Sequence, residues 1–95
     1  MVARIIMIEK KITIINKLGL HARAAAKLVA VASQFSSSIE FSNSGKFVNG
    51  KSIMSVLMLA ASQGTELSLS IEGEDEDDAL LAIETLINDR FDEGE

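Results

Sequence analysis

His21 is the only histidine in the 95-residue sequence, and its position suits covalent chemistry. It directly precedes an alanine-rich segment that favours a helix, and the first N–H groups of a helix are unpaired and attract anions. The positive helix end disfavours the imidazolium form, which leaves a neutral, nucleophilic ring. Arg23 can bind a phosphate through charge-assisted hydrogen bonds. These features favour a histidine that is phosphorylated and then releases the phosphoryl group, over one that lies at a helix start without a chemical role.

Other residues that could take part in chemistry are scarce around His21. No Asp or Glu occurs between Glu9 and Glu40, so no carboxylate close in sequence could help the ring to activate water. A phosphoryl carrier requires this, because hydrolysis would waste the group that it carries. The chain has no cysteine and a single histidine, which excludes thiol catalysis, disulfides and multi-histidine metal sites. We therefore expect no metal and no cofactor.

Residues 45–52 match the phosphate-loop pattern of nucleotide-binding proteins, G-x-x-x-x-G-K-[ST]. Such a loop follows a buried parallel strand, whereas residues 38–42 alternate as an antiparallel strand with one buried face does. Phe47 and Val48 also favour a strand where the loop would have to lie. We interpret the match as a hairpin strand followed by a helix with Ser52 as its N-cap, and keep nucleotide binding as a remote alternative.

Hydrophobic periodicity predicts the elements that position these residues. Strands are expected at residues 7–16, 38–42, 47–48 and 67–72, with a turn at 43–46. Helices are expected at residues 22–35, from Ser52 to about Gly64, and from Asp77 or Asp78 to about Phe91. The helical repeat of the first helix consists of Ala22, Ala25, Ala26, Val29, Ala32 and Phe35. The side chains expected to be buried in the other elements are Ile8, Ile12, Ile14, Ile39, Phe41, Val56, Leu59, Ala60, Leu80, Ile83, Leu86 or Ile87, and Phe91.

This order, β-α-β-β-α-β-α, predicts an α+β fold in which the helices cover one face of a mostly antiparallel sheet. A chain of this size buries roughly 60–65% of its unfolded surface and forms one modest core. We expect a single domain over residues 1–95, with a folded core at about residues 7–91 and a frayed tail at residues 92–95.

The net charge of −5 argues against a general partner such as nucleic acid or an anionic membrane. Residues 1–51 hold eight basic and two acidic residues, whereas residues 52–95 hold one basic and twelve acidic residues. The basic half contains His21, Arg23 and Lys27, so the region around the histidine is locally basic. The longest apolar run, residues 56–61, is far shorter than the roughly 20 residues of a membrane span, and the expected location is the cytoplasm.

Two segments together resemble the HPr family, the phosphocarriers of the bacterial phosphotransferase system. The first comprises residues 19–23 with Ala25, and the second comprises residues 50–54, about thirty residues later. The resemblance extends over roughly residues 8–91. It implies an open-faced β-sandwich, in which three helices cover a four-stranded antiparallel sheet.

The resemblance also implies a reaction and partners. His21 would accept a phosphoryl group on Nδ1 from enzyme I, itself charged by phosphoenolpyruvate, and pass it to the EIIA component of a sugar transporter. Arg23 matches the active-site arginine of the family, and the backbone N–H groups of Ala22 and Arg23 would bind the phosphate. Ala24 departs from the proline that the family usually has there, which would leave the helix start less rigid.

Ser52 matches the serine that an HPr kinase/phosphorylase modifies in many bacteria. A phosphate there would place about two negative charges beside an apolar docking patch for partner proteins. The expected patch consists of Ala26, Lys27, Ala30, Ile53, Met54 and Leu57. Exposed apolar residues rimmed by polar groups are typical of such surfaces.

Two alternatives keep the fold but change the role. One is the nitrogen-type paralogue, a regulatory phosphocarrier whose second helix similarly contains Leu-Met-Leu, as residues 57–59 do here. The other is a non-catalytic regulator that binds its targets through the Ser52 surface, although the presence of both His21 and Arg23 argues against this as the sole role. We expect a monomer in every case.

Overall fold

The sheet has four antiparallel strands in the order β1-β4-β2-β3, so the last strand of the chain lies between the first and the second. The computed structural model describes residues 7–94. Its elements are β1 (Ile8–Thr13), α1 (Ala22–Ala32), β2 (Ser38–Ser42), β3 (Val48–Asn49), α2 (Ile53–Leu57), β4 (Glu66–Glu72), α3 (Glu76–Asn88) and a 3-10 turn, η1 (Arg90–Asp92).

Strand β4 shows why the sheet has one covered face. Leu67, Leu69 and Ile71 are buried, while the alternating Ser68 and Ser70 are half-buried, as a period of two requires. In the register, Leu69 lies opposite Phe41 of β2, and Leu67 lies opposite Ile12 of β1. The apolar positions of neighbouring strands therefore meet on the side of the sheet that faces the helices.

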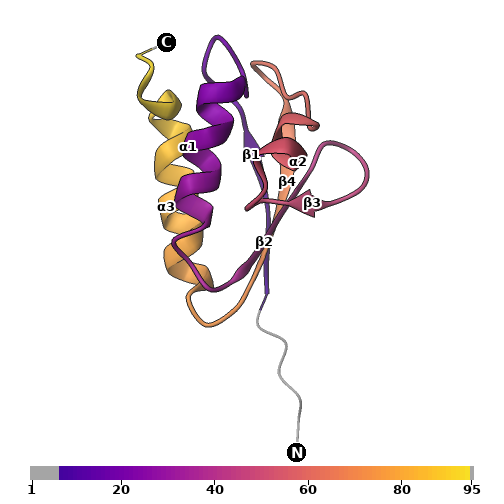
Figure 1. Cartoon of the computed structure of the whole chain (residues 1–95), viewed down its shortest axis with the longest axis vertical. Helices are drawn as coiled ribbons and strands as arrows, with labels where there is room; N and C mark the ends of the chain where they lie inside the picture. The colour runs from indigo at the N-terminus through magenta and orange to yellow at the C-terminus, as the bar shows by residue number, and fades with distance from the viewer. Residues whose placement is uncertain (1–6, 95) are drawn as a thin grey trace, which may run out of the picture.

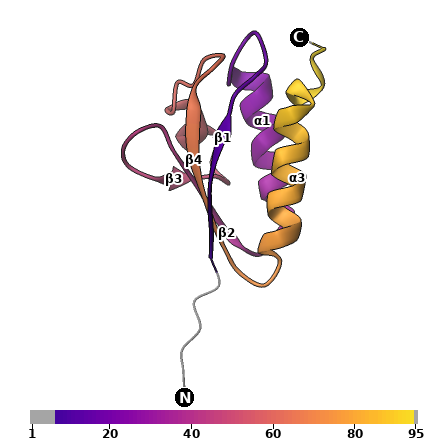
Figure 2. The ribbon, with the colours of Figure 1, turned by 180° about the vertical axis from the view of Figure 1, so that it is seen from behind.

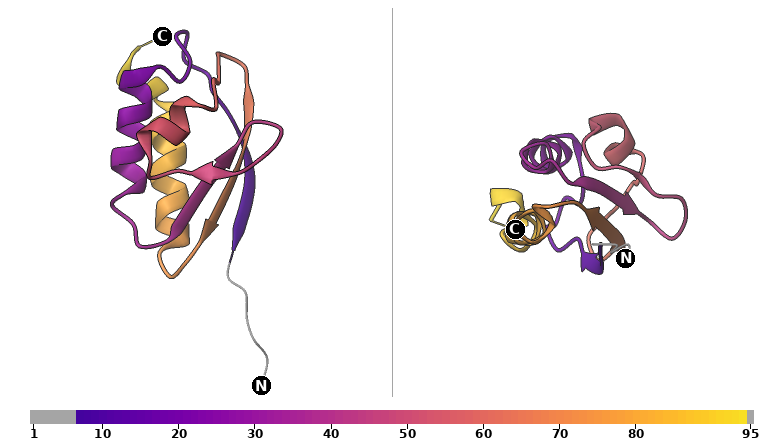
Figure 3. Two further views of the ribbon diagram at one scale, coloured as in Figure 1. Left: turned by 45° about the vertical axis from the view of Figure 1, so that its right-hand side comes forward. Right: turned by 90° about the horizontal axis from the view of Figure 1, so that it is seen from below.

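Helices α1 and α3 lie side by side against this apolar face, and the short α2 lies beside α1 near β3 (Figures 1 and 2). The two layers are clear in the side view and in the view along the long axis (Figure 3). The buried residues come from every strand except β3 and from every helix, and Phe41 and Phe91 are the largest of them. The predicted open-faced α+β fold is confirmed.

The ends of several elements differ from the sequence-based prediction. Helix α1 ends at Ala32 instead of Phe35. Ala22 of the predicted repeat is exposed, Ala26 is exposed as the docking patch requires, and Ala24 and Leu28 are buried. Phe47 lies outside β3, because residues 43–47 form a longer loop. The buried positions of α3 are Ala79, Ile83 and Ile87, with Leu80 and Leu86 only partly buried.

Helix α2 is much shorter than predicted, since it ends at Leu57 instead of near Gly64. After Met58 the chain forms a tight turn, in which the Ala60 N–H donates to the Leu57 carbonyl. Ala60 itself has a φ of 50° and is exposed. This left-handed residue stops the helix although the apolar sequence could have continued it. The chain then runs toward β4 and contacts the loop that carries His21.

Helix α3 begins one or two residues earlier than predicted, at Glu76, and ends at Asn88. Asp75 precedes it and accepts hydrogen bonds from the backbone and hydroxyl groups of Ser36 and Ser37, in the loop between α1 and β2. Phe91 is buried as predicted, but it is reached through a turn in which its φ is 54°. Among residues 7–94, no helix has both the length and the apolar character needed to cross a membrane.

Candidate functional site

The loop between β1 and α1 holds His21 through a set of backbone contacts. The Leu20 N–H donates to the Ala61 carbonyl at 2.8 Å, and the Ile14 N–H donates to the Thr65 carbonyl at 2.9 Å. Gly19 has a φ of 70°, and a Cβ atom placed on it would lie 2.7 Å from the Ala61 carbonyl oxygen. Glycine is required here both by its backbone conformation and by the close approach of the neighbouring chain.

His21 is the N-cap of α1, with extended backbone angles of −79° and 179°. Its carbonyl accepts the Ala25 N–H at 2.8 Å, and its ring Nδ1 accepts the Arg23 N–H at 3.3 Å. The lone pair of Nδ1 is therefore directed at the positive end of the helix, where the backbone N–H groups of Ala22 and Arg23 begin the first turn. The predicted placement of His21 at a helix N-terminus is confirmed.

The other ring nitrogen is in direct contact with a carboxylate that the sequence analysis missed. Nε2 of His21 meets Oε2 of Glu93, 72 positions away in sequence, and Oε1 of Glu93 accepts a hydrogen bond from Nδ2 of Asn16 at 2.9 Å. The expectation that no carboxylate lies near His21 is wrong, because it considered only neighbours in sequence. Residue 93 also differs from the expected frayed tail, since its side chain is only 12% exposed.

Competing effects act on the Glu93 carboxyl. Partial burial raises the pKa of Glu93, but the hydrogen bonds from Asn16 and His21, together with the charges of His21 and Lys27, outweigh it. The net result is a pKa below the usual value of 4.5. Glu93 is therefore a carboxylate at neutral pH and acts as a hydrogen-bond acceptor only.

The tail that carries Glu93 is anchored on α1. Phe91 is fully buried in the core, and its carbonyl accepts a hydrogen bond from Nζ of Lys27 at 2.8 Å. Helix α1 and η1 are in contact, and η1 lies beside the beginning of α1 in both Figure 1 and Figure 2. Lys27 was predicted to belong to a docking patch, whereas its ammonium group also fixes the position of the tail.

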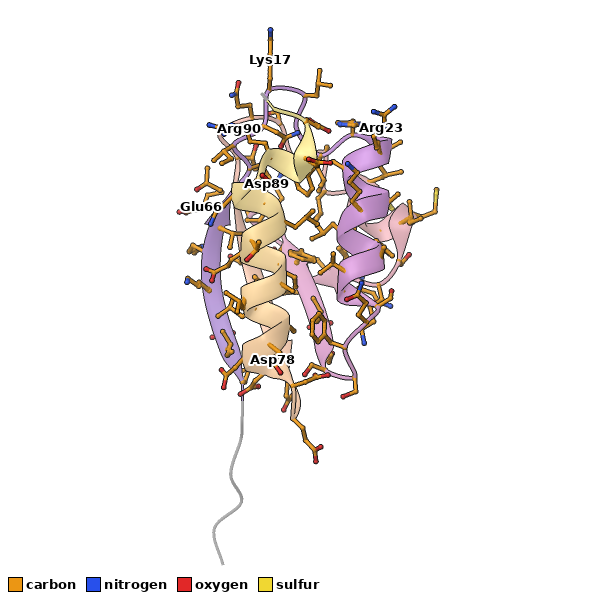
Figure 4. The ribbon with its side chains drawn as sticks, turned by 90° about the vertical axis from the view of Figure 1, so that its left-hand side faces the viewer. Lys17, Arg23, Glu66, Asp78, Asp89 and Arg90 are labelled. Carbon is orange, nitrogen blue, oxygen red and sulfur yellow. The ribbon has the colours of Figure 1, made fainter. Side chains whose placement is uncertain are left out.

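These residues surround an open cleft of about 510 Å³ at the N-terminus of α1. The lining residues are Leu18, His21, Arg23, Lys27, Asp92 and Glu93. Arg23 is exposed, and Figure 4 shows it at the end of the molecule opposite Asp78. A phosphoryl group on Nδ1 would meet the N-terminal N–H groups of α1 and the Arg23 side chain. Among residues 7–94, no group of three or more His, Cys, Asp or Glu residues is arranged as a metal site.

Ala24, where the family usually has proline, is fully buried in the third position of α1. The helix begins at Ala22 without a proline, so the alanine does not prevent the helix start that His21 caps. The N–H of a third helical residue has no partner inside the helix, so a proline there would remove no helical hydrogen bond.

Ser52 is the N-cap of α2, and its Oγ accepts the Ser55 N–H at 3.3 Å, as predicted. The apolar residues around it are open to solvent, with Ile53 and Met54 exposed by 44% and 71%. Leu57 is half-buried, and Ala26 and Ala30 of the adjacent α1 are exposed. Met58 is exposed by 79% and extends this apolar surface. Met58 was not included in the predicted patch, although it lies four residues after Met54 and helical spacing places both on one face.

The phosphate-loop pattern at residues 45–52 has the hairpin structure that was predicted. Val48 and Asn49 form β3, which pairs antiparallel with β2, between the two glycines of the motif. Gly50 is buried against Phe41 and Ile39, and Nζ of Lys51 donates to the Phe35 carbonyl at 2.6 Å. This segment therefore has a strand where nucleotide-binding proteins have a phosphate-binding loop.

Comparison with known proteins relates the chain to one family over nearly its whole length. Residues 8–89 match the family model described as the PTS HPr component phosphorylation site. The phosphocarrier protein HPr of Pseudomonas aeruginosa is 60% identical over 86 residues, which covers 90% of this chain and 96% of that protein. The HPr of Xylella fastidiosa strain Temecula1 is 53% identical over 87 residues, covering 92% and 98%.

Solved structures agree with these relatives. The crystal structure of HPr-C-His from Thermoanaerobacter tengcongensis has a TM-score of 0.85 at 49% identity, covering 90% of this chain and 96% of that one. The phosphocarrier protein HPr of Bacillus anthracis has a TM-score of 0.81 at 37% identity, covering 85% and 96%.

Proposed function

This chain belongs to the HPr family of phosphocarriers of the phosphotransferase system, and on that premise we propose that His21 carries the phosphoryl group. The group would come from enzyme I, which takes it from phosphoenolpyruvate, and would go to the EIIA component of a sugar transporter. The observation that supports this assignment is the position of Nδ1, which accepts the Arg23 N–H at the positive end of α1.

The transfer would be an in-line displacement at phosphorus. The bond from phosphorus to the donor breaks and leaves its electron pair on the donor, while the lone pair of Nδ1 forms the new N–P bond. The N–H groups of Ala22 and Arg23 and the Arg23 guanidinium would then neutralise charge on the phosphoryl oxygens. In transfer to the next protein the N–P bond would break, its electron pair would return to Nδ1, and the same contacts would hold the phosphoryl oxygens.

Intact-mass measurement tests this assignment. The protein would be mixed with phosphoenolpyruvate, magnesium and a bacterial enzyme I, and we expect one acid-labile phosphoryl adduct. The adduct should be absent from His21→Ala, whose fold would be checked by circular dichroism. An adduct that persists in His21→Ala would place the phosphoryl group on another residue. A folded wild-type protein without any adduct would favour the non-catalytic regulator.

We further propose that the partners dock on the apolar surface beside this site, formed by Ala26, Lys27, Ala30, Ile53, Met54 and Leu57. The exposure of Ile53 and Met54 supports it, since neighbouring large apolar side chains that share one exposed patch indicate contact with another protein. A phosphate on Ser52 would weaken docking of enzyme I by charge repulsion and by desolvation of the phosphate.

A pair of variants separates the charge at Ser52 from its capping role. Ser52→Asp should slow transfer from enzyme I, whereas Ser52→Ala removes the hydroxyl that accepts the Ser55 N–H and adds no charge. We expect Ser52→Ala to lose about 1 kcal/mol of unfolding free energy and to keep its transfer rate. Equal transfer rates for Ser52→Asp and wild type would refute regulation at this position. Light scattering would test the monomer that we propose.

A further inference from the structure

Glu93 uses both oxygens of its carboxylate next to the phosphorylation site proposed above. One oxygen is in contact with Nε2 of His21, and the other accepts the Asn16 amide at 2.9 Å. A carboxylate is an acceptor only, so the ring nitrogen that faces it must carry a proton. The proton on Nε2 leaves Nδ1 with a free lone pair, and this is the nitrogen that accepts the Arg23 N–H.

The position of Glu93 is fixed from three directions. Phe91 is buried in the core with a φ of 54°, and Lys27 donates to its carbonyl. Asn16 is also fully buried, and its amide nitrogen donates both to the Gly19 carbonyl at 2.7 Å and to Glu93. The carboxylate is thus held by an element of the core, by α1 and by the loop that presents His21.

We propose that Glu93 is a positioning residue that holds His21 in the Nε2–H tautomer and so keeps Nδ1 available for phosphoryl transfer. The kinetic part of this inference rests on the proposed function. A carboxylate beside the second ring nitrogen of a histidine fixes tautomer and orientation in other sites, by the same physical argument.

The proton balance of the reaction explains why this contact matters. When Nδ1 attacks phosphorus, the N–P bond forms and the ring becomes a cation that keeps its proton on Nε2. The Glu93 carboxylate neutralises that positive charge, while Arg23 and the helix end neutralise the phosphoryl oxygens. When the phosphoryl group leaves, the electron pair returns to Nδ1 and the ring is neutral again. No proton has to enter or leave the site in either step.

The tautomer can be measured directly by nitrogen-15 NMR of the His21 ring at a pH at which the imidazole is neutral. We expect the wild-type ring to carry its proton on Nε2. In Glu93→Gln the Asn16 amide still requires an acceptor and would take the Gln oxygen, which turns the Gln NH₂ toward the ring. The Nε2–H fraction should therefore fall, and in Glu93→Ala it should lie between those of wild type and Glu93→Gln, because the Arg23 N–H still donates to Nδ1.

Asp89→Asn is the matched control, because it removes the same charge four residues away, from an exposed residue that does not line the cleft. It should leave the ring signals unchanged. A wild-type ring protonated on Nδ1, or equal tautomer fractions in wild type, Glu93→Gln and Glu93→Ala, would overturn the inference.

Phosphorylation by enzyme I is the second readout. We expect Glu93→Gln to be phosphorylated about ten- to a hundredfold more slowly than Asp89→Asn, the size of a lost hydrogen bond to a charged group. An unchanged rate would contradict the role in transfer. If wild-type His21 accepted no phosphoryl group at all, the proposed function would fail, and the NMR result would still decide what Glu93 does to the ring.

Discussion

Arg23 contributes to the candidate site through two chemically different groups. Its backbone N–H donates to Nδ1 of His21 at 3.3 Å, a long bond that a phosphoryl oxygen could replace without loss. Its guanidinium is exposed at the rim of the cleft and is not needed for packing. The side chain can therefore be changed while the backbone contact and the fold remain.

Replacing this side chain gives the first prediction. Arg23→Ala should lower the rate of phosphorylation by enzyme I by about ten- to a hundredfold, because charge-assisted hydrogen bonds to the phosphoryl oxygens are lost. Arg23→Lys should recover part of the loss, since it keeps the charge but not the planar fork. Lys46→Ala, which removes one positive charge from the exposed loop after β2, should react like wild type. Equal rates for Arg23→Ala and Lys46→Ala would rule out a role for the guanidinium.

The sequence predicted part of this site and could not predict the rest, for a physical reason. His21, Arg23 and the helix start are close in sequence, so local patterns indicate their arrangement. Glu93 lies 72 positions from His21, and its segment is polar and acidic without periodicity. The packing of Phe91 and the hydrogen bonds from Lys27 and Asn16 bring it to the ring, and these are tertiary contacts.

At the level of elements, the loop before α1 depends on a close approach between two chain segments. Gly19 lies with its Cα against the backbone of Ala61 and Ser62, while Gly64 has a similar positive φ of 88° and open space around it. Both glycines have a left-handed backbone conformation, but only Gly19 lacks room for a Cβ atom. They therefore form a natural pair for comparison.

The second prediction uses this pair. Gly64→Ala should lower the unfolding free energy by about 1–2 kcal/mol, the cost of a left-handed backbone for alanine. Gly19→Ala should cost more, because its Cβ would lie 2.7 Å from a backbone oxygen that cannot move away cheaply. It should also slow phosphorylation, since it displaces the loop that holds His21. Urea denaturation of both variants measures the difference, and equal losses would show that the close approach is not restrictive.

The length of α2 shows how tertiary contacts override a local pattern. Residues 53–61 are apolar enough to continue the helix, yet the helix ends at Leu57 and Ala60 adopts a φ of 50°. Through this turn the Ala61 carbonyl accepts the Leu20 N–H next to His21. Strands β2 and β4 were predicted closely, because alternating patterns such as residues 67–71 directly report the buried face of a sheet. Strand β1 was predicted to extend to residue 16 and ends at Thr13.

At the level of the whole molecule, the end that holds the cleft carries residues of both charges, since Asp89 lies there with Arg23 and Arg90 (Figure 4). Arg23 lies at one end, and Asp78, in the first turn of α3, lies at the other (Figure 4). The acidic first turn of α3 is favourable to that helix, because it neutralises the positive end of the helix dipole. The cleft beside His21 combines Arg23 and Lys27 with Asp92 and Glu93, so it is not the basic region that the sequence analysis expected.

Asp75 connects this acidic end to the rest of the fold and gives the third prediction. Hydrogen bonds from Ser37 and Ser36 outweigh the opposing effect of burial and lower the pKa of Asp75 from 3.8 to about 2. A carboxyl group whose pKa is lower in the folded state than in the unfolded state stabilises the folded state at pH values above its unfolded pKa. This contribution disappears as the pH falls through the folded pKa. Stability should therefore be lost between pH 3.8 and about 2.

Urea denaturation at several pH values tests it. Asp75→Asn should be less stable than wild type near neutral pH, and the difference should shrink as pH falls through this interval. Ser37→Ala, which removes a hydroxyl that donates to Asp75, should reproduce part of this loss of stability near neutral pH. A constant difference between wild type and Asp75→Asn at all pH values would contradict the assignment.

The contact between Glu93 and His21 also has a consequence for the order in which the site forms during synthesis. The ribosome makes His21 and the first turn of α1 early, and Glu93 follows every helix and strand in the sequence. A chain that stops at Asp92 contains all the elements of the fold and lacks the group on Nε2. For the same reason, a purification tag attached directly after this segment would lie next to the histidine ring, whereas a tag placed before β1 would enter at the opposite end of the molecule (Figure 1).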